Sequence, residues 1–217
     1  VRKIHDIKGS QFKAKFHEDY KKMTGTKGIG VISANDEQPI CVYSKFGSFA
    51  IVVNGFVDNA AELASQLYKA GQSFSEVTEG KVNLPELVAK LIIHGETIVG
   101  GIEYMFSKIK GSCSLLLLNR EGVYAARDRY GYSPLVIGQR GADWAVTTES
   151  SAFFNIGFKV TKYLQPGEIV LLDGSGLKTK RKENKTNQIC SFLWVYTGFP
   201  ASSYDGINVE MSREKCG

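Results

Sequence analysis

Residues 47–63 read GSFAIVVNGFVDNAAEL, and within them the apolar spacing changes from a strand pattern to a helix pattern. The apolar run predicts a strand over residues 49–53, and Asp58 or Asn59 is suited to cap the helix that follows. Between them stands Asn54-Gly55, a pair that is most often a hairpin turn when it is seen alone. The functional alternative is an oxyanion hole, because the Gly55 backbone N–H and the Asn54 side-chain amide are two donors that could converge on one oxygen.

On both sides of this segment, apolar periodicity divides the chain into two strand-rich blocks around a helical middle. Further strands of the first block are predicted over residues 2–7, 28–32 and 39–43. Amphipathic helices follow, with apolar residues at helical spacing over residues 63–70, 84–92 and 98–109. Strands return over residues 112–119, 122–127, 134–138, 144–148 and 168–172. This order predicts an α+β sandwich in which antiparallel sheets pack together and carry helices outside.

The composition describes an ordinary soluble globular chain: 217 residues, 43% apolar and 23% charged. No stretch approaches the roughly 20 apolar residues of a membrane-spanning helix, and no signal-peptide pattern opens the chain. We therefore predict a cytoplasmic protein without a membrane partner. The formal charge is +5, but the densest basic run, residues 178–185, has no interleaved aromatic residues. A solvated loop is favoured there over a nucleic-acid site.

The cysteines and histidines form no recognisable site in the sequence. Cys41, Cys113, Cys190 and Cys216 lie far apart without a C-x-x-C pair, so neither a zinc site nor a disulfide framework is indicated. The three histidines do not cluster as a catalytic triad would require. A phosphate-binding loop is also not recognisable. We predict no cofactor and no metal.

Other segments predict local structure. Arg127-Asp128 ends a strand and precedes Gly131, which favours a rigid turn whose carboxylate accepts backbone hydrogen bonds. An acid or base role for Asp128 would need a partner that the sequence does not assign. Ser150 predicts the cap of a helix, and residues 165–168 predict a turn that opens a strand. Residues 190–196 predict an aromatic strand, beyond a polar domain edge at residues 177–188.

Taken in order, these segments resemble the class II (N-terminal nucleophile) glutamine amidotransferase domain of amidophosphoribosyltransferases. The resemblance is carried by Gly28-Ile29-Gly30, Gln38-Pro39, Asn54-Gly55, Asn59-Ala60, Glu62-Leu63, residues 111–118, Arg127-Asp128, Gly131, Pro134-Leu135, Glu149-Ser150 and residues 166–170. Residues 190–209 resemble the segment that leads from this domain into a phosphoribosyltransferase domain. We therefore expect an amidotransferase-like domain over residues 1–189, with its opening segment missing, and a connecting arm over residues 190–217.

The resemblance implies a four-layer αββα sandwich that hydrolyses glutamine to glutamate and ammonia for purine biosynthesis. In that family a cysteine at the first residue of the mature chain attacks the side-chain amide, and an Asn-Gly pair binds the oxyanion. Asn54 and Gly55 match that pair. The ammonia then displaces pyrophosphate from phosphoribosyl pyrophosphate in a second domain.

Several departures from the family pattern concern the substrate. The chain begins at Val1, in what aligns downstream of the family's opening Cys-Gly-Ile, so no catalytic cysteine is assigned. The glutamine-clamping Arg-x-Ser-Thr falls on residues 33–36, which places Ser33 at the arginine and Asp36 at the end of the motif. The family's Ser-Asp-Ser-Glu falls on residues 83–86, which places Leu84 at the ammonium-binding aspartate. We expect a degenerate glutaminase pocket at Ser33, Asp36 and Leu84, which leaves enzymatic activity uncertain.

Alternatives stay open at this level. Cys190 matches a ligand in the iron–sulfur members of the family, but the other ligands would lie in another domain, so a buried thiol is favoured. The domain could instead be a non-catalytic module that binds a phosphoribosyltransferase chain or an active paralogue through its helices and residues 190–209. A homo-oligomer is a separate open alternative. It could also be an N-terminal nucleophile hydrolase for an amide other than glutamine.

Overall fold

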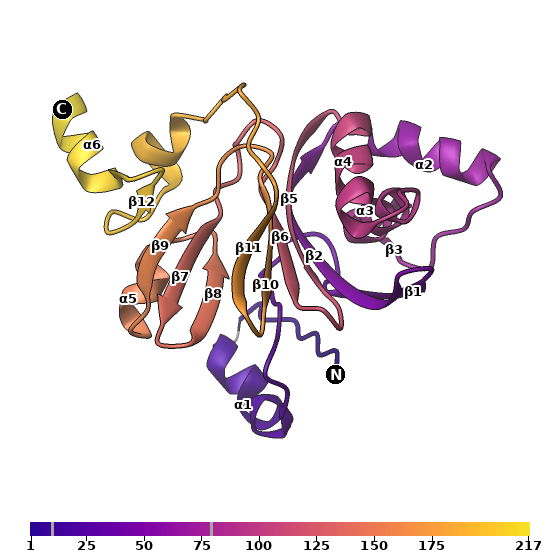
Figure 1. The fold of residues 1–217 in the computed structure, drawn as a ribbon, viewed down its shortest axis with the longest axis horizontal. Helices are drawn as coiled ribbons and strands as arrows, with labels where there is room; N and C mark the ends of the chain where they lie inside the picture. Colours follow the sequence, from indigo (N-terminus) through magenta and orange to yellow (C-terminus); the bar gives the residue numbers. More distant parts are fainter. Residues whose placement is uncertain (10, 79) are drawn as a thin grey trace.

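The computed structural model describes residues 1–9, 11–78 and 80–217, and it is built on two antiparallel sheets packed face to face (Figure 1). The larger sheet has the strand order β1-β2-β5-β6-β10-β11 and the smaller one the order β8-β7-β9. The strands of the larger sheet are β1 (Ile40–Ser44), β2 (Gly47–Val57), β5 (Gly111–Leu118), β6 (Val123–Ala126), β10 (Ile169–Asp173) and β11 (Gly176–Arg181). Those of the smaller sheet are β7 (Val136–Arg140), β8 (Asp143–Thr147) and β9 (Lys159–Tyr163).

Helices cover one face of the larger sheet (Figure 1). They are α2 (Ala60–Lys69), α3 (Leu84–Ile93) and α4 (Ile98–Lys108), with a small hairpin of β3 (Val77–Thr78) and β4 (Lys81–Val82) before α3. The helices begin where the sequence offers a cap: Asn83 Oδ1 accepts a hydrogen bond from Glu86 N at 3.0 Å, and Thr97 Oγ1 accepts one from Gly100 N at 3.0 Å. Their apolar faces bury the main core against β2 and β5, which includes Ile51, Leu87, Ile92, Ile102, Met105 and Leu117.

The second core lies between the two sheets and contains Ala125, Leu135, Ile137, Leu164 and Val170. Because β5 is covered on both faces, its four consecutive leucines need no polar alternation. The short helix α5 (Ser151–Asn155) covers the smaller sheet from outside (Figure 1). Phe153 of α5 packs over Gly138 of β7, where a Cβ would lie 2.8 Å from its ring. The predicted αββα sandwich is confirmed, with a thin fourth layer.

The N-terminal segment differs from the prediction. Residues 2–7 and 28–32 lie outside strands, and an unpredicted helix, α1 (Phe12–Lys22), lies between them. A strand forms only where its backbone groups find a pairing partner, and Gly28 and Gly30 contribute no side chain to pack against a sheet. Ile32 is accordingly 72% exposed.

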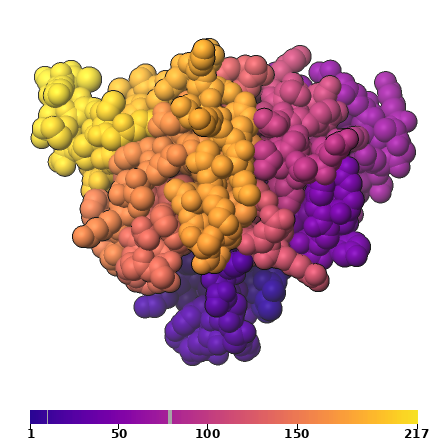
Figure 2. Space-filling view, in the orientation of Figure 1, coloured from indigo at the N-terminus to yellow at the C-terminus, as the bar shows by residue number. Residues whose placement is uncertain are grey.

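The C-terminal arm differs as well. Residues 190–196, predicted as a strand, lead into the π-helical turn η1 (Leu193–Thr197), which is followed by β12 (Ser203–Tyr204), β13 (Ile207–Asn208) and α6 (Val209–Cys216). Arg213 of α6 fixes this turn by donating to the carbonyls of Trp194, Tyr196 and Gly198. A distant cation thus satisfies carbonyls that a strand would have paired. Figure 2 shows residues 190–217 as a lobe at one end of the molecule.

Further local predictions need correction. Cys190 is exposed, not buried, because it precedes a surface turn and not a packed strand. The basic run predicted as a loop begins in β11, an edge strand whose lysines Lys178 and Lys180 are exposed. The Ser150 hydroxyl does not cap α5, since it accepts a hydrogen bond from Ser203 N of the arm at 2.7 Å. None of the described helices is both long and apolar enough to cross a membrane.

Candidate functional site

A small hollow of about 200 Å³ collects the residues that sequence analysis had selected. Asn54 and Gly55 come from β2, Ser33 and Asp36 from the loop before β1, and Leu84 from the first turn of α3. The remaining lining residues are Val31, Ile32, Ala34, Asn35, Gln38 and Val53. Residues from three separate parts of the chain therefore meet at one place.

Asn54-Gly55 is not a hairpin turn in this fold. Both residues lie inside β2, where Asn54 is opposite Ser114 and Gly55 is opposite Cys113 of β5. The two strands approach so closely that a Cβ on Gly55 would lie 2.0 Å from the carbonyl oxygen of Ser112. Glycine is required here by close backbone approach, and the exposed Asn54 side chain stands at the wall of the hollow.

The loop at residues 33–36 is tied to the start of α3. Ser33 Oγ accepts a hydrogen bond from Asp36 N at 3.1 Å, and Asp36 Oδ1 accepts one from Leu84 N at 3.2 Å. A carboxylate is well placed there, because the first N–H groups of a helix have no partner inside the helix and the helix dipole favours a negative charge. Asp36 is half-buried and lines the hollow.

Gln38 is a supporting residue that sequence analysis did not include in the site. Its side chain accepts a hydrogen bond from Val53 N at 2.8 Å and donates one to Val53 O at 3.2 Å, as a neighbouring strand would. These bonds fix the loop beside Asn54 and occupy the Gln38 amide. The only sequence signal for Gln38 was its place in the Gln38-Pro39 motif of the resemblance.

The electrostatics of the hollow are simple. Among the residues that line it, Asp36 is the only one with a formal charge, and no lysine or arginine is present. The positions at which the resemblance implies a guanidinium and a second carboxylate hold Ser33 and Leu84. An anionic ligand group would therefore find no cationic partner in this lining.

A larger apolar hollow of about 580 Å³ shares Val31, Ile32, Val53 and Asn54 with the small one and extends between the two sheets. Its lining includes Leu115 and Leu135, together with Val146 and Thr147 of the edge strand β8. No cysteine is among the residues that line either hollow. Ser114 lines the apolar one, but its hydroxyl already accepts from Asp128 N at 2.9 Å and donates to Ser133 O at 2.9 Å.

Cys113 of β5 is opposite Gly55 of the candidate oxyanion pair, and its side chain is buried in the main core. Complete burial, reinforced by the negative charge of Asp128, raises the pKa of the Cys113 thiol to about 12. The thiol is therefore protonated at neutral pH and is not a thiolate nucleophile.

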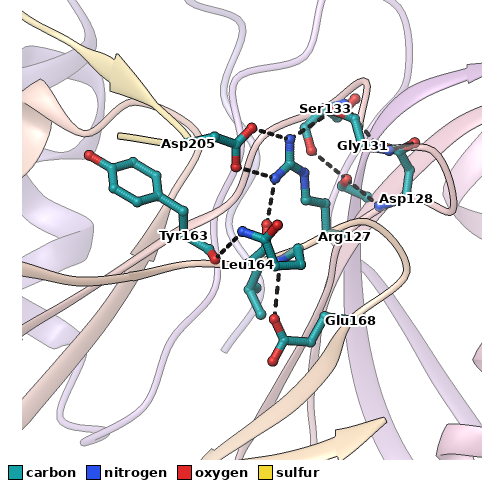
Figure 3. Close-up of polar contacts among 10 residues, drawn as sticks. Arg127, Asp128, Gly131, Ser133, Tyr163, Leu164, Glu168 and Asp205 are labelled. Atoms are coloured by element: carbon teal, nitrogen blue, oxygen red, sulfur yellow. Dashed lines mark hydrogen bonds and ion pairs between the residues drawn. The ribbon is translucent and has the colours of Figure 1, made fainter. Parts of the chain in front are cut away.

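A buried polar framework supports the β5 side of the site (Figure 3). Asp128 accepts hydrogen bonds from Tyr130 N at 3.1 Å, Gly131 N at 2.9 Å and Ser133 N at 2.7 Å. This geometry confirms the predicted turn with a carboxylate at its centre. Through Ser133 the turn reaches both Ser112 and Ser114 of β5, which face Phe56 and Asn54 of β2.

Arg127 connects the same framework to the C-terminal arm (Figure 3). Its side chain is 1% exposed and forms a bidentate ion pair with Asp205, with N···O distances of 2.7 and 3.0 Å. It also donates to the carbonyls of Leu164 at 2.5 Å and Gly131 at 2.8 Å. Within the described residues its Nε is buried without a hydrogen-bond partner. The arm is thus held by charge as well as by packing.

Comparisons with known proteins identify the family to which this fold belongs. Residues 27–155 match the sequence model of a family described as "Glutamine amidotransferase domain". The chain is 27% identical over 209 residues to the amidophosphoribosyltransferase of Archaeoglobus fulgidus, covering 92% of this chain and 46% of that protein. It is 32% identical over 174 residues to that of Bacillus subtilis, covering 79% and 36%. The chain therefore spans less than half the length of these relatives.

Solved structures give the same result. Glutamine phosphoribosylpyrophosphate amidotransferase from B. subtilis, complexed with ADP and GMP, superposes with a TM-score of 0.73 at 31% identity, over 82% of this chain and 39% of that one. A structure described as the allosteric regulatory enzyme of purine biosynthesis gives a TM-score of 0.74 at 31% identity, over 84% and 39%. This chain therefore belongs to the family of glutamine amidotransferase domains, and its relatives are those of amidophosphoribosyltransferases.

Proposed function

We propose that this domain keeps the amidotransferase framework and the Asn54-Gly55 oxyanion pair, while its pocket no longer holds free glutamine well. The observation that carries the proposal is the charge of the hollow, where Asp36 is the only charged lining residue. Glutamine is a zwitterion, and the resemblance implies an arginine for its carboxylate and an aspartate for its ammonium. Ser33 and Leu84 stand in those places.

The size of the effect follows from the two contacts. A hydrogen bond to a charged group contributes roughly 1.5–3 kcal/mol, so the loss of the arginine contact alone weakens glutamine binding by about 10- to 10²-fold, and the loss of both contacts weakens it by about 10²- to 10⁴-fold. This weakening does not depend on which residue acts as the nucleophile, since it concerns binding of the substrate and not the chemical step.

Restoring the charges tests the proposal. We expect the double variant Ser33→Arg, Leu84→Asp to bind glutamine at least about 10-fold more tightly than the unmodified chain in isothermal titration calorimetry. The matched control Ser33→Gln, Leu84→Asn adds similar bulk without charge and should leave the affinity unchanged. Urea unfolding of each variant checks that Leu84, which packs against the main core, tolerates replacement. Submillimolar glutamine binding by the unmodified chain would refute the proposal.

A second role is favoured by the surface of the arm. Phe192, Val195, Tyr196 and Phe199 are 54–73% exposed and lie close together in the chain at η1. Large exposed apolar clusters often mark interfaces. We propose that the protein acts in the cytoplasm in purine biosynthesis. We also propose that this cluster contacts a phosphoribosyltransferase unit, because the relatives are named amidophosphoribosyltransferases. Replacing Phe192 and Tyr196 by serine should abolish co-elution with that unit in size-exclusion chromatography, and unchanged co-elution would contradict this role.

A further inference from the structure

Asp36 places a carboxylate next to Leu84, the position at which the resemblance implies an aspartate. Its Oδ1 lies 3.2 Å from the backbone nitrogen of Leu84, so the acid stands at the first turn of α3 although it comes from a loop 48 residues earlier in the chain. The Ser33 hydroxyl holds the backbone of Asp36 in this position. The hollow therefore has a negative group beside the residue from which the family's aspartate would extend.

This carboxylate has capacity for a ligand. In the part of the chain that the structure describes, Oδ1 accepts the Leu84 N–H, Oδ2 accepts no hydrogen bond, and Asp36 forms no ion pair. A carboxylate offers about four acceptor positions, so most of them remain free. A half-buried and unpaired negative charge attracts a cationic group more strongly than a fully solvated one does.

The same charge disfavours a ligand carboxylate. Among the described residues, no cation lines the hollow to offset repulsion between Asp36 and a second anion. A ligand whose carboxylate is converted to an amide or a peptide bond avoids this repulsion. The loop residues Ile32, Ser33, Ala34 and Asn35 at the hollow are all exposed, so a chain attached in place of the carboxylate can extend into solvent.

The part of the hollow that β2 lines suits a carboxamide. The Asn54 side chain and Gly55 line this part of the hollow. A primary amide is neutral, and its oxygen becomes an oxyanion in the tetrahedral intermediate, which N–H donors of this kind stabilise. The volume of about 200 Å³ is below the roughly 300–1,000 Å³ typical of larger ligands, which limits the occupant to one side chain.

We infer that this hollow binds primary carboxamides that carry an ammonium group and no free carboxylate, with Asp36 as the ammonium acceptor and Asn54-Gly55 at the carboxamide. The amino-terminal glutaminyl residue of a peptide has this chemistry. The inference rests on the proposed function, since it takes the same hollow and the same oxyanion pair and specifies what they accept.

Related ligands separate the contributions of charge. L-glutaminamide has the ammonium only, L-glutamine has both charges, N-acetyl-L-glutamine has the carboxylate only, and N-acetyl-L-glutaminamide has neither. Their affinities are measured by ligand-observed NMR at about pH 6.5, where α-amino groups are protonated. We expect glutaminamide to bind at least about 10-fold more tightly than each of the others.

Two variants assign the effect to Asp36. Asp36→Asn keeps an acceptor for Leu84 N but removes the charge, and it should remove the preference for glutaminamide. The control Glu37→Gln removes a neighbouring exposed charge that does not line the hollow, and it should preserve the preference.

The outcomes distinguish this inference from the proposed function. Failure of all four ligands to bind, or a glutaminamide preference that survives Asp36→Asn, overturns the inference and leaves the weak binding of glutamine intact. Glutamine binding as tightly as glutaminamide overturns the inference, because the hollow then accepts a carboxylate, and it overturns the proposed function as well when that binding is submillimolar.

Discussion

The buried framework around Arg127, which contacts β5, and the hollow around Asp36, which β2 lines, differ in how completely their polar groups are paired. Asp128 accepts three backbone hydrogen bonds, and Arg127 makes four bonds through its terminal nitrogens (Figure 3). Asp36 accepts one hydrogen bond and borders solvent. A single replacement in the framework leaves a buried charge without its partner. A replacement in the hollow leaves a polar group that water can still hydrate. Replacements in the framework therefore lower the free energy of unfolding strongly, whereas replacements in the hollow can alter the ligand with little loss of stability.

Breaking the framework should have the largest effect. Asp205→Ala leaves the Arg127 guanidinium buried without its counter-charge, and we expect the free energy of unfolding to fall by about 3–5 kcal/mol in urea denaturation. Asp143→Ala is the control, because it removes an exposed ion pair with Arg140 and should cost only about 0–1 kcal/mol. Equal losses in the two variants would mean that burial does not make the Arg127–Asp205 ion pair more important for stability than an exposed ion pair.

The sequence predicted the framework only where it is local. The turn at Asp128 follows from residues within five positions of one another, and it was predicted correctly. The ion pair of Arg127 with Asp205 joins residues 78 positions apart and had no local signal. The same limit applies to β9, whose residues Lys159–Tyr163 lack a regular apolar alternation and become a strand by pairing with β7.

For the hollow, the order of motifs identified the residues, but only the fold showed how they meet. Sequence alone favoured a turn at Asn54-Gly55, and pairing with β5 overrides that local preference. The contact between Asp36 and Leu84 could not be read from either motif, because it depends on where the loop meets α3.

A methyl group at Gly55 tests whether the protein requires the close approach of β2 and β5 beside the hollow. Gly55→Ala would place a Cβ 2.0 Å from the Ser112 carbonyl oxygen, so β2 and β5 must separate. We expect a loss of about 1–3 kcal/mol in the free energy of unfolding. Gly174→Ala is the control, since a Cβ there meets nothing within 4 Å. An unchanged stability of Gly55→Ala would show that the close approach of these strands is not required.

The smallest predicted effect concerns Cys113, which is opposite Gly55 on β5 and is buried in the main core. Burial raises the pKa of its thiol from 9.0 to about 12, so above pH 9 the unfolded chain releases a proton that the folded chain retains. Stability is therefore fully present below pH 9 and falls as the pH rises toward 12, by up to about 1.4 kcal/mol for the first pH unit. Thermal unfolding between pH 8 and about pH 10 measures this slope.

Cys113→Ala should reduce the alkaline slope, whatever its stability at neutral pH, because the titrating group is gone. Cys41→Ala is the matched control and should keep the alkaline slope, because it removes an exposed thiol and leaves the buried Cys113 thiol in place. Tyr124 and Tyr204 keep part of the slope in both variants, because burial and a hydrogen bond to a glutamate raise the pKa of each phenol. If the slope of Cys113→Ala matched that of the unmodified chain, folding would not shield the Cys113 thiol from water. The strand pair at Gly55 would then separate the hollow from the core less completely than its close approach implies.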